Sequence, residues 1–321
     1  MYKLDRLDKG IMLELDKNAR ASYQQIAKNI KSKKDVVAYR VNKLLSEKII
    51  KKFVTIFALG KLQNFCYKIY FQFQGLGDEQ KMLDDFNKDP HVIWIAKCEG
   101  RWDLMLSHYA SNNIEYAQMK NKIFRKYGKY VHEYSILMDE EAYIFNRDYL
   151  VPSTTQRNFS LYISKIERLD ISSKEKELLH LIANNARFKI LDLAKALSLD
   201  VKTIQNKIKK FEKMKLIQGY TTFFDLNKIG LKFFKIFIYI QEKSEQEYNA
   251  LFEYCAQLKN VIHIIKTIGS WELELEIEAE DIDYIHKLTK DIMNKFPNII
   301  KKIESVIISD EMKLDFFPQN Y

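Results

Sequence analysis

Apolar residues recur with helical spacing three times near the start of the chain. Leu7, Ile11 and Leu15 share one helical face, and residues 23–30 form a second amphipathic segment. A third segment, residues 34–47, carries apolar side chains at i, i+4 and i+7, and a short aromatic and β-branched run follows it. The pattern predicts three short helices and then a wing or connecting strand, which are the elements of a winged helix-turn-helix module.

The same pattern occurs a second time further along the chain. Asn18–Arg20 recurs as Asn185–Arg187, an offset of 167 residues, and the match continues without a gap through the helical region. Later the offset becomes 169, where Gly100–Leu104 matches Gly269–Leu273. Each repeat runs for about 140 to 150 residues, which is the size of one or two complete domains. The chain is therefore interpreted as a duplicated whole protein.

After the helices, the apolar period in each repeat changes to that of β-strands. The order is strand, helix, strand, strand, helix, strand, which is the ferredoxin-like plan. In the first repeat we expect these elements at residues 66–73, 78–88, 92–98, 103–109, 112–127 and 130–138, and in the second at residues 233–240, 244–258, 261–268, 272–279, 281–296 and 299–308.

The predicted fold class is α+β, with each winged helix-turn-helix domain followed by a ferredoxin-like βαββαβ domain. We place the helix-turn-helix domains at residues 1–60 and 169–227, and the ferredoxin-like effector or assembly domains at residues 61–145 and 228–321. Residues 146–168 are expected to be a linker, because they hold polar turn formers and the only proline of that region.

One predicted strand has a regular acidic face. Residues 271–278 read Trp-Glu-Leu-Glu-Leu-Glu-Ile-Glu, so that Glu272, Glu274, Glu276 and Glu278 share one side of the strand. We interpret this side as the solvated outer face of a half-buried strand rather than as an acidic binding site, and we assign it no metal.

The overall composition is that of an ordinary globular protein, with 47% hydrophobic and 30% charged residues. The three cysteines, Cys66, Cys98 and Cys255, show no C-x-x-C spacing, which argues against a disulfide framework or a structural zinc site. A reducing, cytoplasmic location is therefore expected. The chain has no apolar leader and no run of about 18 apolar residues, so we expect neither secretion nor a membrane partner.

Positive charge is concentrated in the helical segments. Residues 17–52 hold eleven Lys or Arg and two acidic residues, and residues 184–215 hold nine and three. The formal net charge of the whole chain is +9, so the rest of the chain is acidic overall. This distribution favours a polyanionic partner for the helical modules.

Within each module the basic and polar residues form a stripe on the third helix, opposite its apolar face. Such a stripe suits a recognition helix in the major groove of double-stranded DNA, although a basic stripe also occurs as a merely solvated face. The candidate DNA-binding residues are Lys34, Tyr39, Arg40 and Lys43 in the first repeat, and Lys202, Thr203, Asn206, Lys207 and Lys210 in the second.

The ordered motifs resemble the leucine-responsive regulatory protein and asparagine regulator family, Lrp/AsnC, over nearly the whole chain and twice. The motifs that carry the resemblance are Leu4–Ile11, Asn18–Arg20, Arg40–Leu44, Leu216–Tyr220, Gly100–Asp103 and Gly269–Glu272. The resemblance implies a DNA-binding helix-turn-helix and a ferredoxin-like (RAM-type) domain that pairs with its twin and often builds larger assemblies. It also implies that a small molecule, commonly an amino acid, binds near the glycine-acid turn, which makes Gly100, Asp103, Gly269 and Glu272 candidate effector-binding residues.

We therefore expect a sequence-specific transcriptional regulator that is not an enzyme and needs no cofactor. One chain would form an intramolecular pseudo-dimer, would assemble further as a homo-oligomer, and would present two non-identical recognition helices to an asymmetric operator. One alternative is an enzyme, because the siroheme decarboxylases resemble the same architecture. Another is a ligand-binding protein with vestigial DNA-binding domains. The six histidines do not coincide between the repeats and show no ligand spacing; they are His91, His108, His132, His180, His263 and His286.

Overall fold

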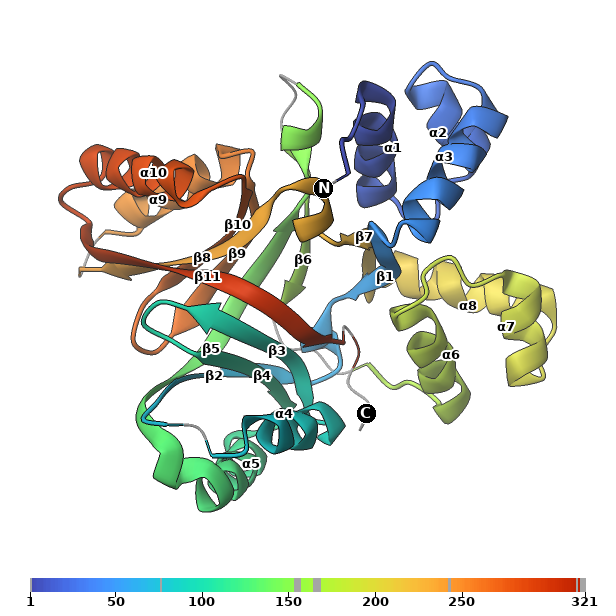
Figure 1. The fold of residues 1–321 in the computed structure, drawn as a ribbon. Helices are drawn as coiled ribbons and strands as arrows, with labels where there is room; N and C mark the ends of the chain where they lie inside the picture. Colours follow the sequence, from blue (N-terminus) through green and yellow to red (C-terminus); the bar gives the residue numbers. More distant parts are fainter. Residues whose placement is uncertain are drawn as a thin grey trace. The chain divides into compact units, whose positions relative to one another are not determined.

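The computed structural model describes residues 2–75, 77–152, 157–163, 169–241, 244–315 and 317. The chain divides into two compact units, and each unit takes the equivalent parts of both repeats (Figure 1). Unit 1 consists of Met1–Ala58, Ile144–Tyr162 and Leu169–Leu231. Unit 2 consists of Leu59–Tyr143, Ile163–Arg168 and Lys232–Tyr321.

Unit 1 contains both helix-turn-helix modules, as the sequence predicts. Capping boxes begin the first helix of each, Asp5 with Asp8 in one and Ser172 with Glu175 in the other. The modules consist of α1 (Arg6–Lys17), α2 (Tyr23–Asn29), α3 (Lys34–Ser46) and β1 (Ile50–Phe57), and of α6 (Ser173–Ala183), α7 (Ile190–Leu197), α8 (Val201–Lys213) and β7 (Ile217–Phe224).

The strand predicted to follow the three helices, as a wing or connecting strand, pairs with the equivalent strand of the other repeat. β1 and β7 form an antiparallel two-stranded sheet in which Val54 lies opposite Thr221 (Figure 1). These two residues are equivalent in the repeats, so a local pseudo-two-fold axis passes between them. The two helix-turn-helix modules therefore pack as a pseudo-dimer within one chain.

Reciprocal hydrogen bonds hold this pseudo-dimer together, and the repeated Asn-Ala-Arg motif makes them. The backbone N–H of Ala19 donates to Tyr220 O, and that of Ala186 donates to Phe53 O, both at 2.9 Å. The Arg20 guanidinium donates to Ala186 O at 2.9 Å, and the Arg187 guanidinium donates to Ala19 O at 2.6 Å. The motif thus fixes one module against the other.

The segment expected to be a linker is packed against unit 1 at several of the positions that the structure describes. Leu150, in the 3₁₀ helix η3 (Asp148–Leu150), is buried in the core of α1–α3. The Arg147 N–H donates to the buried Asp16 carboxylate at 2.7 Å. Phe159, in β6 (Phe159–Ile163), contacts Phe145 with ring centroids 5.8 Å apart. Residues 153–156 and 164–168 of this segment lie outside the described residues.

Unit 2 contains both ferredoxin-like domains in the predicted element order. Their last strands are longer than predicted, because each pairs along its length with strands of both repeats. The elements are β2 (Phe65–Phe73), α4 (Glu79–Lys88), β3 (Val92–Glu99), β4 (Leu104–Ala110), α5 (Asn113–Tyr127) and β5 (Val131–Phe145), then β8 (Lys232–Ile240), α9 (Glu245–Gln257), β9 (Val261–Ile268), β10 (Leu273–Ala279), α10 (Ile282–Lys295) and β11 (Ile300–Leu314). Short 3₁₀ turns, here and in unit 1, are η1 (Leu59–Lys61), η2 (Gly128–Tyr130) and η4 (Asn227–Ile229).

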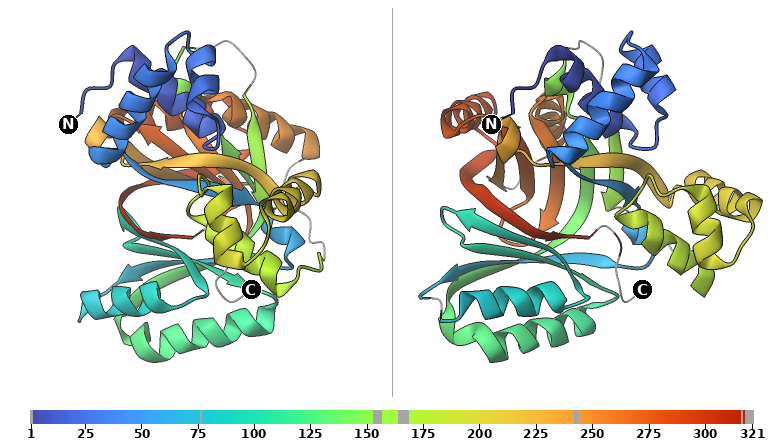
Figure 2. Two further views of the ribbon diagram at one scale, coloured as in Figure 1. Left: turned by 90° about the vertical axis from the view of Figure 1, so that its right-hand side faces the viewer. Right: turned by 45° about the vertical axis from the view of Figure 1, so that its right-hand side comes forward.

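The strands of unit 2 close into a ring. Their order is β2-β4-β3-β11-β8-β10-β9-β5, and β5 also pairs with β2. Strands of the two repeats meet at β3–β11 and at β9–β5. Helices α4 and α5 cover one side of this barrel, and α9 and α10 cover the opposite side (Figure 2). The barrel leaves none of these strands with an open edge, which closes the two domains on each other.

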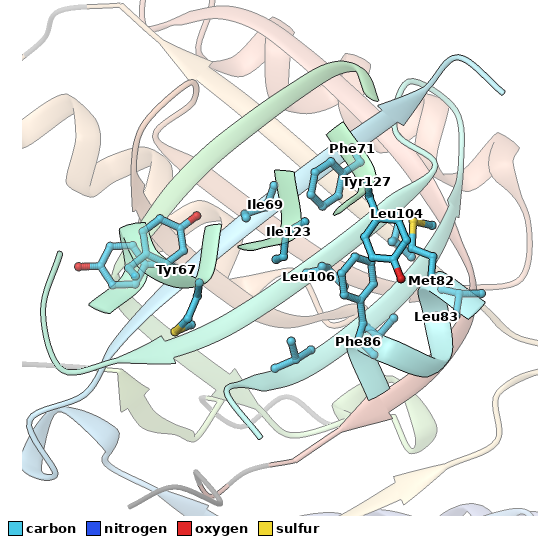
Figure 3. Packing of buried hydrophobic residues seen from close by; sticks show 14 of the residues in the cluster. Tyr67, Ile69, Phe71, Met82, Leu83, Phe86, Leu104, Leu106, Ile123 and Tyr127 are labelled. Atoms are coloured by element: carbon cyan, nitrogen blue, oxygen red, sulfur yellow. The ribbon is translucent and has the colours of Figure 1, made fainter. Parts of the chain in front are cut away.

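Each strand therefore has a face toward the helices and a face toward the barrel interior. In the first repeat Ile69 and Leu106 point toward the helices and pack with Phe86 of α4 and Ile123 of α5 (Figure 3). The alternate residues of β2, among them Lys68 and Tyr70, point the other way. They lie in the barrel interior.

No described helix is both long and apolar enough to cross a membrane. All three cysteines are buried and carry free thiols.

Candidate nucleic-acid interface and the buried ion-pair network

The candidate DNA-binding residues of the first repeat separate into two groups on α3. Lys34 and Tyr39 are exposed, and Tyr39 keeps 66% of its surface. The Arg40 guanidinium instead turns back toward α1, 2.9 Å from the Asp5 carboxylate and 3.2 Å from that of Asp8. Arg40 therefore holds the recognition helix to the first helix and is only partly available to a ligand.

The second repeat makes the same contact with the equivalent residues. The Lys207 ammonium lies 3.2 Å from Glu175 Oε1, and that of Lys210 lies 3.1 Å from the same oxygen. Burial by itself raises the pKa of Glu175, but hydrogen bonds from Ser172, Lys210 and Lys207 lower it to about 2. Glu175 and Lys207 occupy the places of Asp8 and Arg40, so this contact is a shared structural feature of both modules.

The remaining candidates face outward or support the helix start. Lys202 and Asn206 are exposed on α8. Thr203 is partly buried, and its backbone N–H donates to the Asp200 carboxylate at 2.8 Å, which caps α8. Lys43 lies over the Tyr2 ring, 5.4 Å from its centroid. The outward stripe on each helix is thus narrower than the sequence predicts.

The glycine-acid turns have a structural role in both repeats. The Asp103 carboxylate accepts the Phe73 N–H at 2.7 Å, and the Glu272 carboxylate accepts the Ile240 N–H at 2.7 Å. Phe73 and Ile240 are equivalent residues at the ends of β2 and β8. Each acid thus holds the end of a neighbouring strand, and a ligand amine would share the carboxylate with that N–H.

The glycines of these turns permit a close approach of the other repeat. Gly100 has φ +135° and Gly269 has φ +154°, a region that favours glycine. A Cβ on Gly269 would lie 2.8 Å from Ile136 O, and one on Gly100 would lie 3.2 Å from Val306 Cγ1. Ile136 belongs to the first repeat and Val306 to the second, so each turn contacts the last strand of its twin.

The acidic face of β10 is buried, which corrects the expectation of a solvated outer face. Glu274 is 0% exposed, Glu276 is 8% exposed and Glu278 is 1% exposed. The face points into the barrel interior, where closure of the ring covers it. The alternation shows that the two faces of the strand differ, but it does not show which face meets water.

Two buried lysines form ion pairs with Glu274 and Glu276 of this face. The Lys68 ammonium lies 2.8 Å from Glu274 Oε2, and the Lys235 ammonium lies 2.9 Å from the same oxygen. Lys235 also lies 2.8 Å from Glu276 Oε1, and Lys68 lies 2.9 Å from Asp139 Oδ1. We call these five residues the buried ion-pair network. Lys68 and Lys235 are equivalent positions, one from each repeat.

Burial and charge within the network shift the pKa values of its carboxylates. Burial by itself raises the pKa of Glu274, but the ammonium groups of Lys235 and Lys68 lower it to about 2. Burial raises the pKa of Asp139, opposed by Lys68. The two ammonium groups therefore keep Glu274 ionised in the barrel interior.

Aromatic rings surround the network. The Trp271 indole N–H donates to Glu274 Oε1 at 2.9 Å, and the Tyr70 hydroxyl hydrogen-bonds to the same oxygen. The Trp102 and Trp271 rings, which are equivalent in the repeats, lie 6.2 Å apart by their centroids. These two tryptophans are buried and pack in the barrel interior. The lysine that interrupts both apolar strands was a signal for the network that sequence reasoning missed.

A buried histidine stands apart from these sites. His108 is 1% exposed, and within the described ranges both of its ring nitrogens lack a hydrogen-bond partner. Burial lowers its pKa to about 4. The described residues include no group of three or more His, Cys, Asp or Glu side chains arranged to hold a metal ion.

Comparison with known proteins agrees with this architecture. A family model for winged helix-turn-helix DNA-binding domains matches residues 4–51. An uncharacterized HTH-type transcriptional regulator of Pyrococcus furiosus is 33% identical over 116 residues, which are 35% of this chain and 77% of the relative. The chain belongs to the Lrp/AsnC family.

A second uncharacterized HTH-type transcriptional regulator of Pyrococcus furiosus is 24% identical over 146 residues, 44% of this Lrp/AsnC chain and 94% of the relative. That relative is about as long as one repeat. The crystal structure of the siroheme decarboxylase NirDL matches with a TM-score of 0.63 and 14% identity, and covers 98% of this chain and 94% of its own. This match establishes a shared fold over both repeats of the Lrp/AsnC protein.

Proposed function

We propose that this Lrp/AsnC protein is a sequence-specific, double-stranded-DNA-binding transcriptional regulator, and that it acts by binding rather than by catalysis. The observation that carries the proposal is the pair of helix-turn-helix modules tied together by reciprocal contacts in unit 1. Each module presents a recognition helix from one of the two most basic segments of the chain. The matched family model and the names of the sequence relatives support the same function.

Electrostatics favour DNA over a neutral partner. The exposed lysines of α8 include Lys202, Lys209 and Lys213, and unit 2 contributes much of the acidic remainder of the chain. Lysine contacts to phosphates release counterions, so the affinity falls steeply as salt rises. Because Arg40 and Lys207 are held in ion pairs, we expect the outward residues of each recognition helix to contact the bases.

The test is selection of duplexes from a random library with the purified chain, followed by titration of the selected duplex at two salt concentrations. Lys202→Ala/Lys209→Ala on α8 should weaken binding at least about tenfold and lower the salt slope by about one for each phosphate that is no longer neutralised. Lys287→Ala/Lys290→Ala, which removes two exposed lysines from α10 of unit 2, is the matched control and should bind normally. Failure to select any duplex, or equal binding by both variants, would refute DNA binding.

We also propose a small-molecule effector, such as an amino acid, at the turns that hold Asp103 and Glu272. Each carboxylate has an oxygen beyond the one that accepts the backbone N–H, and Asp103 is exposed. A bound ammonium group would pair with that carboxylate. A thermal-shift screen with the amino acids should raise the melting temperature for one of them, and this shift should be lost in Asp103→Asn. We also propose that the chain assembles further as a homo-oligomer and acts in the cytoplasm.

A second candidate function is siroheme decarboxylation, which the full-length fold match to NirDL favours. That enzyme has also been crystallised with an iron-uroporphyrin III analogue. Beside α5 of this chain an open hollow of about 520 Å³ is lined by Gln118, Asn121, Phe124 and Arg125. It holds one cation, whereas a tetrapyrrole with several carboxylates needs several. A titration with siroheme followed by absorbance, with product analysis, decides the matter: a saturable shift and loss of carboxyl groups would establish the enzyme.

A further inference from the structure

The two helix-turn-helix modules are related by a local pseudo-two-fold axis. Arg20 and Arg187 exchange equivalent hydrogen bonds, and Val54 pairs with Thr221 at the centre of the two-stranded sheet. Equivalent surfaces related by a two-fold axis meet DNA half-sites that are inverted relative to each other. One chain therefore carries both halves of the reading surface in a fixed arrangement.

Three exposed residues near the start of α3, Asp35, Val36 and Tyr39, are acidic, apolar and aromatic, and the exposed Lys34 precedes them. Val36 is 37% exposed and Tyr39 is 66% exposed, and the exposed Asp35 precedes them at the helix start. Arg40, which follows Tyr39, is drawn toward the first helix by Asp5. In the major groove, apolar side chains contact the C5-methyl group of thymine, which distinguishes it from the other bases.

The equivalent residues of α8 have a different chemistry. Lys202 occupies the place of Asp35, Thr203 that of Val36, and Asn206 that of Tyr39. Lys202 and Asn206 are exposed. An asparagine in the major groove makes two hydrogen bonds to adenine, through N6 and N7, and lysine meets phosphates or guanine.

We infer that this chain, as a single molecule, reads two inverted half-sites of different sequence. α3 reads thymine methyl groups through Val36 and Tyr39, and α8 reads adenine through Asn206. This inference rests on the proposed DNA-binding function and names its target as a non-palindromic duplex.

The test replaces thymine by uracil in one half-site at a time of the selected duplex, because this change removes only the C5-methyl group. Loss of the methyls under α3 should weaken binding at least about fivefold, which is within the range measured for single base contacts. The same loss under α8 should have less effect. Val36→Ala/Tyr39→Ser should remove the methyl dependence, whereas Tyr134→Ser, which changes an exposed aromatic residue of unit 2, should leave it intact.

A graft distinguishes the two helices directly. Asp35→Lys/Val36→Thr/Tyr39→Asn gives α3 the outward residues of α8 and should shift the preference, by about tenfold or more, toward a perfect inverted repeat of the α8 half-site. All three residues are exposed, and an unchanged thermal melt of the variant shows that it folds.

The possible outcomes distinguish a failure of this inference from a failure of the proposed DNA-binding function. Failure to select any duplex overturns both. A selected duplex that is palindromic, or equal methyl dependence in its two half-sites, overturns this inference and leaves DNA binding intact. A non-palindromic duplex with methyl dependence confined to the half-site that responds to Val36→Ala/Tyr39→Ser supports it.

Discussion

Replacement of Glu274 by glutamine tests whether the buried ion-pair network stabilises unit 2. The change keeps the shape of the side chain but removes the charge that both Lys68 and Lys235 contact, at 2.8 and 2.9 Å. Removing one partner of a buried ion pair costs about 3–5 kcal/mol when it leaves the other charge alone in a low dielectric. Here Lys68 keeps Asp139 at 2.9 Å and Lys235 keeps Glu276 at 2.8 Å, so we expect about 1.5–3 kcal/mol for the lost charge-assisted contacts. Whole domains are stable by only about 5–15 kcal/mol, so the loss is a large fraction of the total.

The assay is urea denaturation followed by tryptophan fluorescence. All three tryptophans of the chain, Trp94, Trp102 and Trp271, lie in unit 2, so the signal reports on the unit that holds Glu274. Glu280→Gln removes an exposed carboxylate just beyond the end of the same strand and should leave the free energy of unfolding within about 0.5 kcal/mol.

A double-mutant cycle identifies the cause. Lys68→Met/Glu274→Gln removes one positive and one negative charge, and Lys235 keeps Glu276 at 2.8 Å. Lys68→Met also takes the lysine away from Asp139, so both single variants are destabilised. The double variant should be less destabilised than the sum of the two single variants by at least about 1 kcal/mol, because the Lys68–Glu274 contact is lost only once. A destabilisation below about 1 kcal/mol in the single variant, or simple additivity in the cycle, would refute the electrostatic account.

The network should also make the stability of the folded chain depend on pH. The pKa of Glu274 is lowered to about 2 in the folded chain, below its ordinary value of 4.5. Its contribution to stability is therefore fully present above pH 4.5 and is lost as the pH falls toward 2. Acid unfolding monitored by tryptophan fluorescence should be less steep in Glu274→Gln than in the unchanged chain.

Three further changes test other parts of the structure. His108→Ile, the residue that the second repeat carries at this place, should stabilise the chain by about 1–3 kcal/mol in urea denaturation, because it removes unpartnered buried nitrogens. With the pKa of His108 lowered to about 4 by burial, only the unfolded chain takes up its proton between pH 6.5 and 4, so stability falls across that window and should fall less in the variant. Gly269→Ala should lower the melting temperature, because its Cβ meets Ile136 O at 2.8 Å, whereas Gly128→Ala, with 3.6 Å to its nearest neighbour, should not. Glu175→Gln should destabilise unit 1 in thermal melts yet tighten DNA binding at low salt, because it frees two lysine ammonium groups.

The element order could be predicted because it depends on local periodicity. The strand expected at residues 66–73 is β2 (Phe65–Phe73), and the one expected at 233–240 is β8 (Lys232–Ile240). The internal repeat then predicted the pseudo-dimer, since the same surfaces occur twice in one chain. Strand ends were less predictable, because β5 and β11 extend to meet partners from the other repeat.

The buried acidic face could not be assigned from the strand alone. In a single ferredoxin-like domain the inner face of the sheet is open, and Glu274 and Glu276 on it would meet water. Only the second domain covers that face, and sequence periodicity carries no information on which strands far apart will meet. Lys68 and Lys235, each flanked on both sides by apolar or aromatic residues of its strand, were the available sign that a charged core lay between the two domains.

The outward stripe of the recognition helices could also be predicted only in part. Their outward stripe could be predicted from helical geometry, but the direction of Arg40 and Lys207 depends on Asp8 and Glu175. These acids belong to the capping boxes that begin the first helix of each module. That a capping acid also draws in a cation from the third helix follows from tertiary packing, so the stripe was read as wider than it is.

Duplication within one chain explains why the two halves can differ so sharply where they meet. The places of Glu274 and Glu276 are taken in the first repeat by Met105 and Ser107. Two copies of the second repeat, paired as a homodimer, would bury twice as many of these carboxylates around the same axis, and two copies of the first would leave Lys68 without Glu274. A covalent link holds the unlike halves at high effective concentration, so the unlike pair forms preferentially. The same constraint keeps α3 and α8 in one molecule, which allows one recognition helix to change its chemistry while the other retains its own.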